Sequence, residues 1–123
     1  KPCTAYQGSM VTADGRILFV CRVARKEYVW LVFDPATRRC KIGRPLPYVT
    51  SGRFVFAEKR PVNGKNYFTC QGYFYEFDPA KDTVIPLFKD KVLNDSNYIH
   101  FAEEDQYMYF RYEAQLMRWK FVN

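Results

Sequence analysis

The segment WLVFDPATR (residues 30–38) recurs in altered form as FYEFDPAKD (residues 74–82). Matching positions in the two copies lie 44 residues apart, as Phe33 and Phe77 show. A Pro-Leu pair follows each copy, at residues 45–46 and 86–87. A whole unit of strand, turn and strand is therefore duplicated, and the chain is predicted to be a small repeat protein.

In each copy an alternating, aromatic-rich strand ends at an Asp-Pro pair. Proline has a fixed φ angle and disfavours the helical region for the residue before it, so the strand has to turn there. Asp34 and Asp78 occupy the first position of a predicted type I turn, where a carboxylate accepts a hydrogen bond from a backbone N–H. The return strands are predicted at residues 39–46 and 83–88.

A third, degraded copy of the unit is predicted at residues 109–116, where Tyr112 takes the place of Phe77. This segment lacks the proline, but a strand-like segment follows it at residues 117–122. Three copies divide the chain of 123 residues into repeat-like units of similar length, at about 8–47, 48–88 and 89–123.

The rest of the chain also has the pattern of an all-β protein. Aromatic residues make up 19% of the sequence and alternate with charged or small residues, as strands require. No long window has a helical period. Asn63-Gly64 is predicted to form a hairpin turn with positive φ at both positions. The turn signals predict about twelve short antiparallel strands, at residues 9–12, 17–24, 28–33, 40–46, 49–50, 53–58, 67–77, 83–87, 91–93, 98–102, 107–112 and 117–122.

Three units of four strands favour a closed pseudo-threefold barrel of the β-trefoil kind, in a single domain, and this is the fold class we expect. The pattern aromatic-x-x-Phe-Asp-Pro-Ala also resembles the outer strands of β-propeller blades of the kelch and hemopexin type, which implies a small propeller-like fold as an alternative. An ordinary β-sandwich is the third alternative. The glycine pair of a kelch blade and the Gln-x-Trp signature of lectin trefoils are both absent.

Four cysteines without a Cys-x-x-Cys pair do not match the spacing of zinc ligands, so no metal or other cofactor is expected. Two disulfides are expected instead, with Cys21 to Cys40 as the most local of the pairings that Cys3, Cys21, Cys40 and Cys70 allow. Disulfides, and a chain that begins without methionine, predict a secreted, extracellular protein. Asn94 begins a three-residue N-glycosylation pattern.

The net charge of +6 is unevenly distributed, because residues 1–65 hold 13 Lys and Arg against four Asp and Glu. The simplest interpretation is a solvated outer face. A more specific one is a single basic face that attracts an acidic protein or a sulfated glycosaminoglycan. Exposed tyrosines beside it would add the residue types that dominate protein interfaces. The candidate binding residues are Arg22, Arg25, Lys26, Arg38, Arg39, Lys41, Arg44, Tyr73 and Tyr75.

The search for catalytic groups finds one histidine, His100, with the acidic run 103–105 nearby and Arg111 or Arg53 as a possible cation. A histidine and a carboxylate can exchange a proton, as small secreted ribonucleases require. A solvent-facing strand histidine is the favoured interpretation, and we do not expect an enzyme. Single-stranded nucleic acid stacks on aromatic residues, but an all-β core uses aromatics as filler, so nucleic acid is an unlikely partner.

These observations favour a small, secreted, disulfide-stabilised binding protein of the effector or inhibitor type. It would engage another extracellular protein through loops and a basic-aromatic face. A glycan or heparin-binding module is one alternative, and a small ribonuclease that uses His100 is another. No apolar stretch approaches the 18 residues that a membrane span needs.

Overall fold

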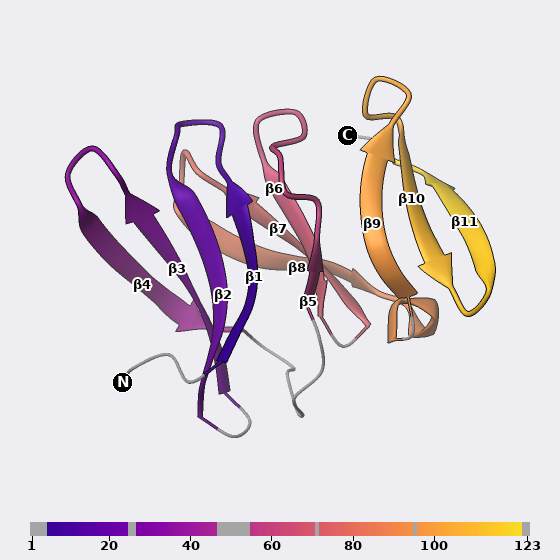
Figure 1. The fold of residues 1–123 in the computed structure, drawn as a ribbon, viewed down its shortest axis with the longest axis horizontal. Coiled ribbons are helices and arrows are strands. Elements are labelled where there is room, and N and C mark those ends of the chain that lie inside the picture. The colour runs from indigo at the N-terminus through magenta and orange to yellow at the C-terminus, as the bar shows by residue number, and fades with distance from the viewer. Residues whose placement is uncertain (1–4, 25–26, 47–54, 71, 95, 122–123) are drawn as a thin grey trace.

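A computed structural model describes residues 5–24, 27–46, 55–70, 72–94 and 96–121 of the chain (Figure 1). Within these ranges the regular structure is antiparallel β-sheet, apart from one turn of 3-10 helix, η1 (Lys91–Asn94). The all-β prediction is therefore confirmed. The strands are β1 (Ala5–Val11), β2 (Ile17–Ala24), β3 (Glu27–Asp34), β4 (Arg39–Pro45), β5 (Val55–Ala57), β6 (Asn66–Cys70), β7 (Tyr73–Asp78), β8 (Thr83–Lys89), β9 (Ser96–Ala102), β10 (Tyr107–Tyr112) and β11 (Gln115–Lys120).

The strands form three separate sheets, and in each sheet they follow one another in chain order. The first sheet has the order β1-β2-β3-β4, the second β5-β6-β7-β8, and the third β9-β10-β11. The expected closed barrel is not supported, because among the described residues no sheet closes on itself or pairs with the next. The repeat units associate by packing side chains face to face, so their edges do not hydrogen-bond into one cylinder.

The second sheet lies between the other two (Figure 1), and its strands β6 and β7 carry buried side chains on both faces, whereas β8 is mostly exposed. All five residues of β6 are buried. Phe68, Tyr75 and Phe77 face the first sheet, where they pack with Trp30 and Val32. The opposite face carries Tyr67 and Phe74, which pack against Leu93, Ile99, Phe101, Met108 and Phe110 of the third unit. Strands covered on both sides have no solvent-facing row, which explains why aromatic residues occur on both faces of β6 and β7.

The two Asp-Pro turns form as predicted. Asp34 accepts a hydrogen bond from the N–H of Ala36 at 2.9 Å, and Asp78 accepts one from Ala80 at 3.0 Å. The fifth residue of each turn has positive φ, 59° at Arg38 and 50° at Asp82. The Asn63-Gly64 turn is also confirmed, with φ of 52° and 81°.

Several predicted boundaries differ from the structure. The strand expected over residues 67–77 is two strands, because Gly72 takes a φ of 82° and turns the chain. The strand expected at 91–93 is the 3-10 turn η1, which the Asp90 side chain begins by accepting the N–H of Val92 at 2.9 Å. The expected strand at 49–50 lies outside the described residues.

The third copy of the repeat was placed in the wrong register. Residues 109–112 belong to β10, the second strand of its sheet, whereas β3 and β7 are third strands. The structural counterpart of β3 and β7 is β11, which contains Trp119 and ends at Lys120. The match between Tyr112 and Phe77 rested on aromatic character alone, which every strand of this chain shares.

The expected pair of disulfides is wrong. Cys21, Cys40 and Cys70 form no disulfide with one another, and Cys3 lies outside the described residues. Two bridges among four cysteines would need at least one bridge within that group of three. Cys21 lies opposite Val29 and Cys40 opposite Phe33, four residues apart along β3. This separation is about 13 Å along the strand, beyond the reach of a disulfide.

Cys40 and Cys70 differ in their surroundings. Cys40 is exposed, whereas Cys70 is buried and burial raises the pKa of its thiol to about 12. Secretion stays a prediction, but it loses the support that two disulfides would have given it.

Gly43 on β4 lies directly against the indole ring of Trp30. A Cβ atom at this position would stand 1.9 Å from Trp30 Cε2, well inside contact distance. The indole is 6% exposed and packs on Phe77 with ring centroids 5.6 Å apart. The absence of a side chain at position 43 therefore allows Trp30 to fill the space between the first two sheets.

We expect Gly43→Ala to lower the free energy of unfolding by about 1 to 3 kcal/mol, because the new methyl group displaces the indole from a packed position. Urea denaturation followed by circular dichroism measures the change. Thr83→Ala, at an exposed position across the gap, is the matched control and should change stability by less than about 0.5 kcal/mol. Equal stability of the two variants would contradict the packing described here.

Candidate functional site

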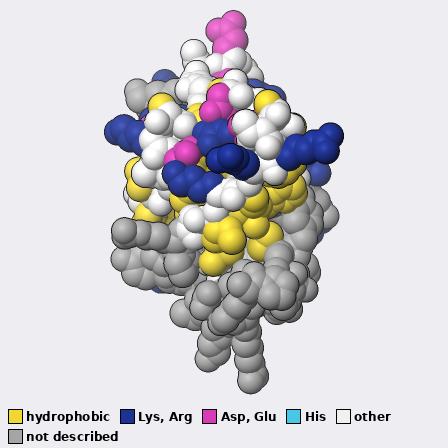
Figure 2. Space-filling model, turned by 90° about the vertical axis from the view of Figure 1, so that its left-hand side faces the viewer, with side chains coloured by type: hydrophobic (Ala, Val, Ile, Leu, Met, Phe, Trp, Pro, Cys, Tyr) yellow, Lys and Arg dark blue, Asp and Glu magenta, His cyan; other side chains and the backbone are white. Residues whose placement is uncertain are grey.

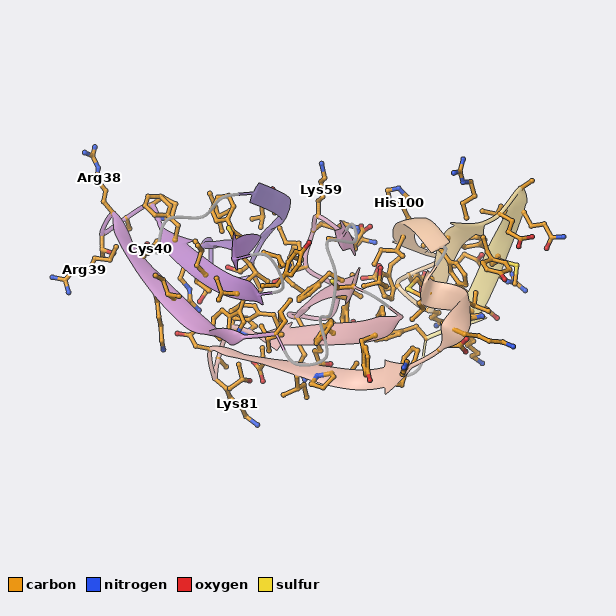
Figure 3. All side chains as sticks on the ribbon, turned by 90° about the horizontal axis from the view of Figure 1, so that it is seen from below. Arg38, Arg39, Cys40, Lys59, Lys81 and His100 are labelled. Carbon is orange, nitrogen blue, oxygen red and sulfur yellow. The ribbon has the colours of Figure 1, made fainter. Side chains whose placement is uncertain are left out.

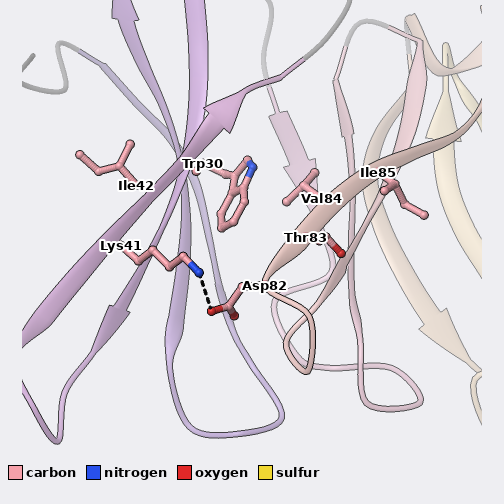
Figure 4. A pocket seen from close by; sticks show the side chains of 8 residues that line it. Trp30, Lys41, Ile42, Asp82, Thr83, Val84 and Ile85 are labelled. Carbon is pink, nitrogen blue, oxygen red and sulfur yellow. Dashed lines mark hydrogen bonds and ion pairs between the residues drawn. The ribbon is translucent and has the colours of Figure 1, made fainter.

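A pocket of about 570 Å³ opens between the first and second sheets, where β4 and β8 diverge (Figure 4). Trp30 and Val84 supply its apolar surface, and the Lys41–Asp82 ion pair stands at one end. Figure 4 shows Ile42 and Ile85 pointing away from Trp30, so these residues line the pocket with their backbone. The volume is within the range of small-molecule and side-chain binding pockets.

The pocket is bordered by two sheet edges. Among the described residues, β4 pairs only with β3 and β8 only with β7, so each strand is at the edge of its sheet. Pro86 interrupts the row on β8 because proline lacks an N–H. On β4, residues 39–44 contain no proline. The edge of β4 is therefore the more suitable template for an added strand.

Ion pairs between the first and second units close one end of the pocket. Arg16, in the turn between β1 and β2, donates to Asp82 Oδ1 at 2.6 Å and to the carbonyl of Pro79 at 3.0 Å. Lys41 Nζ lies 3.3 Å from Asp82 Oδ2. The bond from Arg16, assisted by Lys41, lowers the pKa of Asp82 below its ordinary value, and Asp82 and Asp14 raise the pKa of Arg16. The carboxylate is thus ionised at neutral pH and ties the first sheet to the second.

The basic residues near this pocket are those of the two Asp-Pro hairpins. Arg38 and Arg39 extend from the turn between β3 and β4, and Lys81 extends from the turn between β7 and β8 (Figure 3). All three are exposed and make no ion pair within the described ranges. None of the three lines the pocket, but Asp82 is already neutralised by Arg16 and Lys41, so the two hairpins next to the pocket carry surplus positive charge.

The structure assembles only part of the predicted basic face. Arg38, Arg39 and Lys41 cluster at the β3–β4 hairpin, although Lys41 is paired with Asp82. Arg22 lies on β2 and Arg44 on β4, but the structure does not describe their side chains. Arg25, Lys26 and Arg53 lie outside the described residues altogether. Asn94 is the last residue of η1, and its modification stays a prediction.

The two predicted tyrosines differ in accessibility. Tyr75 is fully buried and stacks on Phe68 at 5.1 Å, so its assignment to a binding surface is wrong. Tyr73 is half-buried beneath Lys89, whose Nζ lies 5.3 Å from the ring centroid. They share one face of β7 as predicted, but that face is covered by the first sheet over most of its length.

His100 has a carboxylate neighbour, but a different one from those predicted. Its Nδ1 lies 3.2 Å from Oε2 of the buried Glu58, whose other oxygen binds Arg60 at 2.9 Å. In the acidic run, Asp105 pairs with Arg60 at 2.6 Å, and Glu103 accepts a hydrogen bond from Tyr109. The His100–Glu58 and Arg60–Asp105 pairs join the second unit to the third, and the nuclease hypothesis stays a prediction.

Sequence inspection missed Trp30, Asp82 and Val84 as site residues. The repeat itself carried a usable signal, because Arg38 and Asp82 occupy matching turn positions and bear opposite charges. The repeat does not indicate which sheet faces pack together. It therefore does not indicate where a pocket opens.

Comparisons with known proteins add no further assignment: no protein-family model matches this chain, and no curated protein matches it at a significant level. Within the part of the chain that the structure describes, no helix has the length and apolar character to cross a membrane.

We expect Asp82→Asn to lower the free energy of unfolding at pH 7 by about 1 to 2 kcal/mol, because it removes a charged partner from Arg16 and Lys41. Asparagine tolerates the positive φ of this position, so the backbone should be unaffected. Because the pKa of Asp82 is lowered in the folded state, its contribution is complete above the unfolded pKa of about 3.9 and is lost as the pH falls through the folded value.

Urea unfolding between pH 7 and pH 2.5 measures this difference, which should shrink below about pH 4. The exposed Glu104, changed to Gln, serves as the control and should show no comparable pH-dependent difference. A gap between wild type and Asp82→Asn that stays constant over this range would contradict the ion-pair assignment.

Proposed function

We propose that this protein binds an extended, acidic segment of another protein in the pocket between β4 and β8. The observation that carries the proposal is the pocket itself, which combines an apolar surface and a strand edge and lies next to two basic hairpins. Backbone hydrogen bonds to β4 would supply affinity, and a side chain inserted over Trp30 would supply specificity.

The apolar part of the pocket favours an aliphatic or aromatic anchor on the partner. Trp30 is held in place by Phe77 and Gly43, so the surface that it offers is rigid. A rigid aromatic surface needs little ordering on binding and is typical of interface hot spots.

The charge around the pocket favours acidic residues on either side of that anchor. The side chains of Arg38, Arg39 and Lys81 make no ion pair in the described ranges, and arginine binds carboxylates with two parallel hydrogen bonds. Sulfate groups of a glycosaminoglycan match the same arginines, but they would leave the apolar surface of Trp30 and Val84 unused. A protein segment is therefore the better fit.

The arrangement of the sheets supports a propeller-like interpretation of the fold. Each sheet is a consecutive up-and-down meander, and β1, β5 and β9, the first strands, lie next to one another (Figure 1). The sheets diverge from that side as propeller blades do. Under this interpretation the pocket lies at the outer rim, between the last strands of two neighbouring blades.

Tryptophan fluorescence provides the test, because Trp119→Phe leaves Trp30 as the only tryptophan. A ten-residue peptide of alternating glutamate and valine with one central leucine should shift the emission of Trp30 and saturate. An isosteric peptide with lysine in place of glutamate should not bind. Arg38→Glu combined with Arg39→Glu should weaken the binding of the acidic peptide by at least about tenfold at low salt.

Lys91→Glu combined with Lys120→Glu is the matched control, since it changes the net charge equally on the third unit and should leave affinity within about twofold. No emission change with any peptide would overturn the proposal. Saturable binding of a heparin hexasaccharide, without peptide binding, would favour the glycan alternative instead.

A further inference from the structure

The pocket between β4 and β8 has an apolar part and a polar end (Figure 4). Trp30 and Val84 form the apolar part. At the polar end, Lys41 extends from β4 and Asp82 from the turn before β8, and Lys41 Nζ lies 3.3 Å from Asp82 Oδ2. A ligand that fills the pocket therefore meets an apolar surface and an ion pair within one cavity.

The two carboxylate oxygens of Asp82 are held to different degrees. Oδ1 accepts a hydrogen bond from Arg16 at 2.6 Å, and the Arg16 side chain is only 17% exposed. Oδ2 contacts Lys41, whose side chain is 64% exposed. An ion pair with an exposed lysine contributes little free energy. A ligand group can therefore enter between Lys41 and Oδ2 at small cost, while Arg16 keeps the carboxylate in place.

The charges at this end of the pocket balance one another. Arg16 binds Asp14 at 2.9 Å as well as Asp82 at 2.6 Å. Lys41 adds a second cation, so two positive groups contact two carboxylates. From the side of the first sheet, Lys and Arg side chains are seen among Asp and Glu side chains and next to hydrophobic ones (Figure 2). A charged group inserted into the Lys41–Asp82 pair would leave one charge in excess, which is costly in a partly buried place. A neutral polar group is the better fit.

We propose that the pocket selects a tyrosine side chain on the bound segment. The ring would cover Trp30 and Val84, and the hydroxyl would donate to Asp82 Oδ2 and accept from Lys41 Nζ. A hydroxyl is able to do both, because it has one O–H and two lone pairs. This inference rests on the proposed function and adds to it the identity of the anchor.

The ionisation of Asp82 favours such a bond. The hydrogen bond from Arg16, assisted by Lys41, lowers the pKa of Asp82, so the carboxylate is charged at neutral pH. A charged acceptor makes a shorter and stronger hydrogen bond with a hydroxyl than a neutral acceptor does.

Other side chains satisfy only part of the pocket. Phenylalanine and leucine cover the apolar part, but they shield the ion pair from water without offering it a new partner. Serine and threonine carry a hydroxyl and bring little apolar surface. Tryptophan donates through its N–H but has no acceptor for Lys41. A site that hydrogen-bonds a hydroxyl discriminates against the analogue that lacks it, so the contrast between tyrosine and phenylalanine is the informative one.

Isothermal titration calorimetry of the whole chain tests the proposal with three peptides. Each is the peptide of alternating glutamate and valine described above, with tyrosine, phenylalanine or O-methyltyrosine at its centre. The tyrosine peptide should bind at least about fivefold more tightly than the phenylalanine peptide, because it adds a hydrogen bond to a charged group. O-methyltyrosine keeps the ring and the oxygen but cannot donate, so its peptide should bind no more tightly than the phenylalanine peptide.

Asp82→Asn should remove the preference for tyrosine and leave the affinity for the phenylalanine peptide within about twofold, because it keeps the shape and loses the charged acceptor. A purely structural effect would instead weaken both peptides equally. Asp14→Asn is the matched control. It also removes a carboxylate from Arg16, but Asp14 is not among the residues that line the pocket, so the full preference should remain.

Tyrosine and phenylalanine peptides that bind within about twofold of each other would overturn the proposal and leave peptide binding itself intact. An O-methyltyrosine peptide that binds as tightly as the tyrosine peptide, or a preference that Asp82→Asn leaves unchanged, would do the same. Absence of binding by all three peptides would overturn the proposed function and, with it, this inference.

Discussion

The structure depends on the burial of β6 and β7, two strands of the middle sheet, on both of their faces. Tyr67 and Phe74 stack on one face at 5.5 Å, and Phe68 and Tyr75 stack on the other at 5.1 Å. Each fully buried aromatic side chain contributes about 1.5 to 3 kcal/mol of hydrophobic stabilisation. Without the second sheet, the two outer sheets would expose one whole apolar face each. The three units are therefore interdependent, as repeats that cannot bury a face alone have to be.

Polar contacts then fix how the packed sheets are aligned. The amide of the buried Asn66 donates to the carbonyl of Val11 at 2.9 Å, and the Val11 N–H bonds the carbonyl of Lys59 at 2.9 Å. Arg16 spans the first two units, and Arg60 reaches the carbonyl of Phe101 at 2.9 Å in the third. Apolar packing is not directional, so these few bonds decide the stagger between sheets.

Local features of the fold were predictable because they depend on neighbouring residues. The Asp-Pro turns and the Asn63-Gly64 turn follow from the φ preference of each residue, and the limits of β2 and β10 follow from simple alternation. The sequence pattern did not separate β6 from β7 at Gly72, because both strands carry aromatic residues on both faces and no polar run marks the turn between them. The register of the third unit was missed because aromatic residues occur in all of its strands. The disulfides were inferred from a cysteine count, which carries no distance.

The sequence by itself determined that the chain is an all-β repeat, where its principal hairpins turn, and that its basic residues concentrate in the first half. Only the tertiary structure decided that the sheets stack instead of closing. It also decided that Tyr75 is core while Trp30 lines a pocket, and that Asp82 binds Arg16 across two repeats. The physical reason is that turns and strands are set by interactions a few residues long. The partner of each sheet face is set by contacts between residues that the chain separates by forty or more positions.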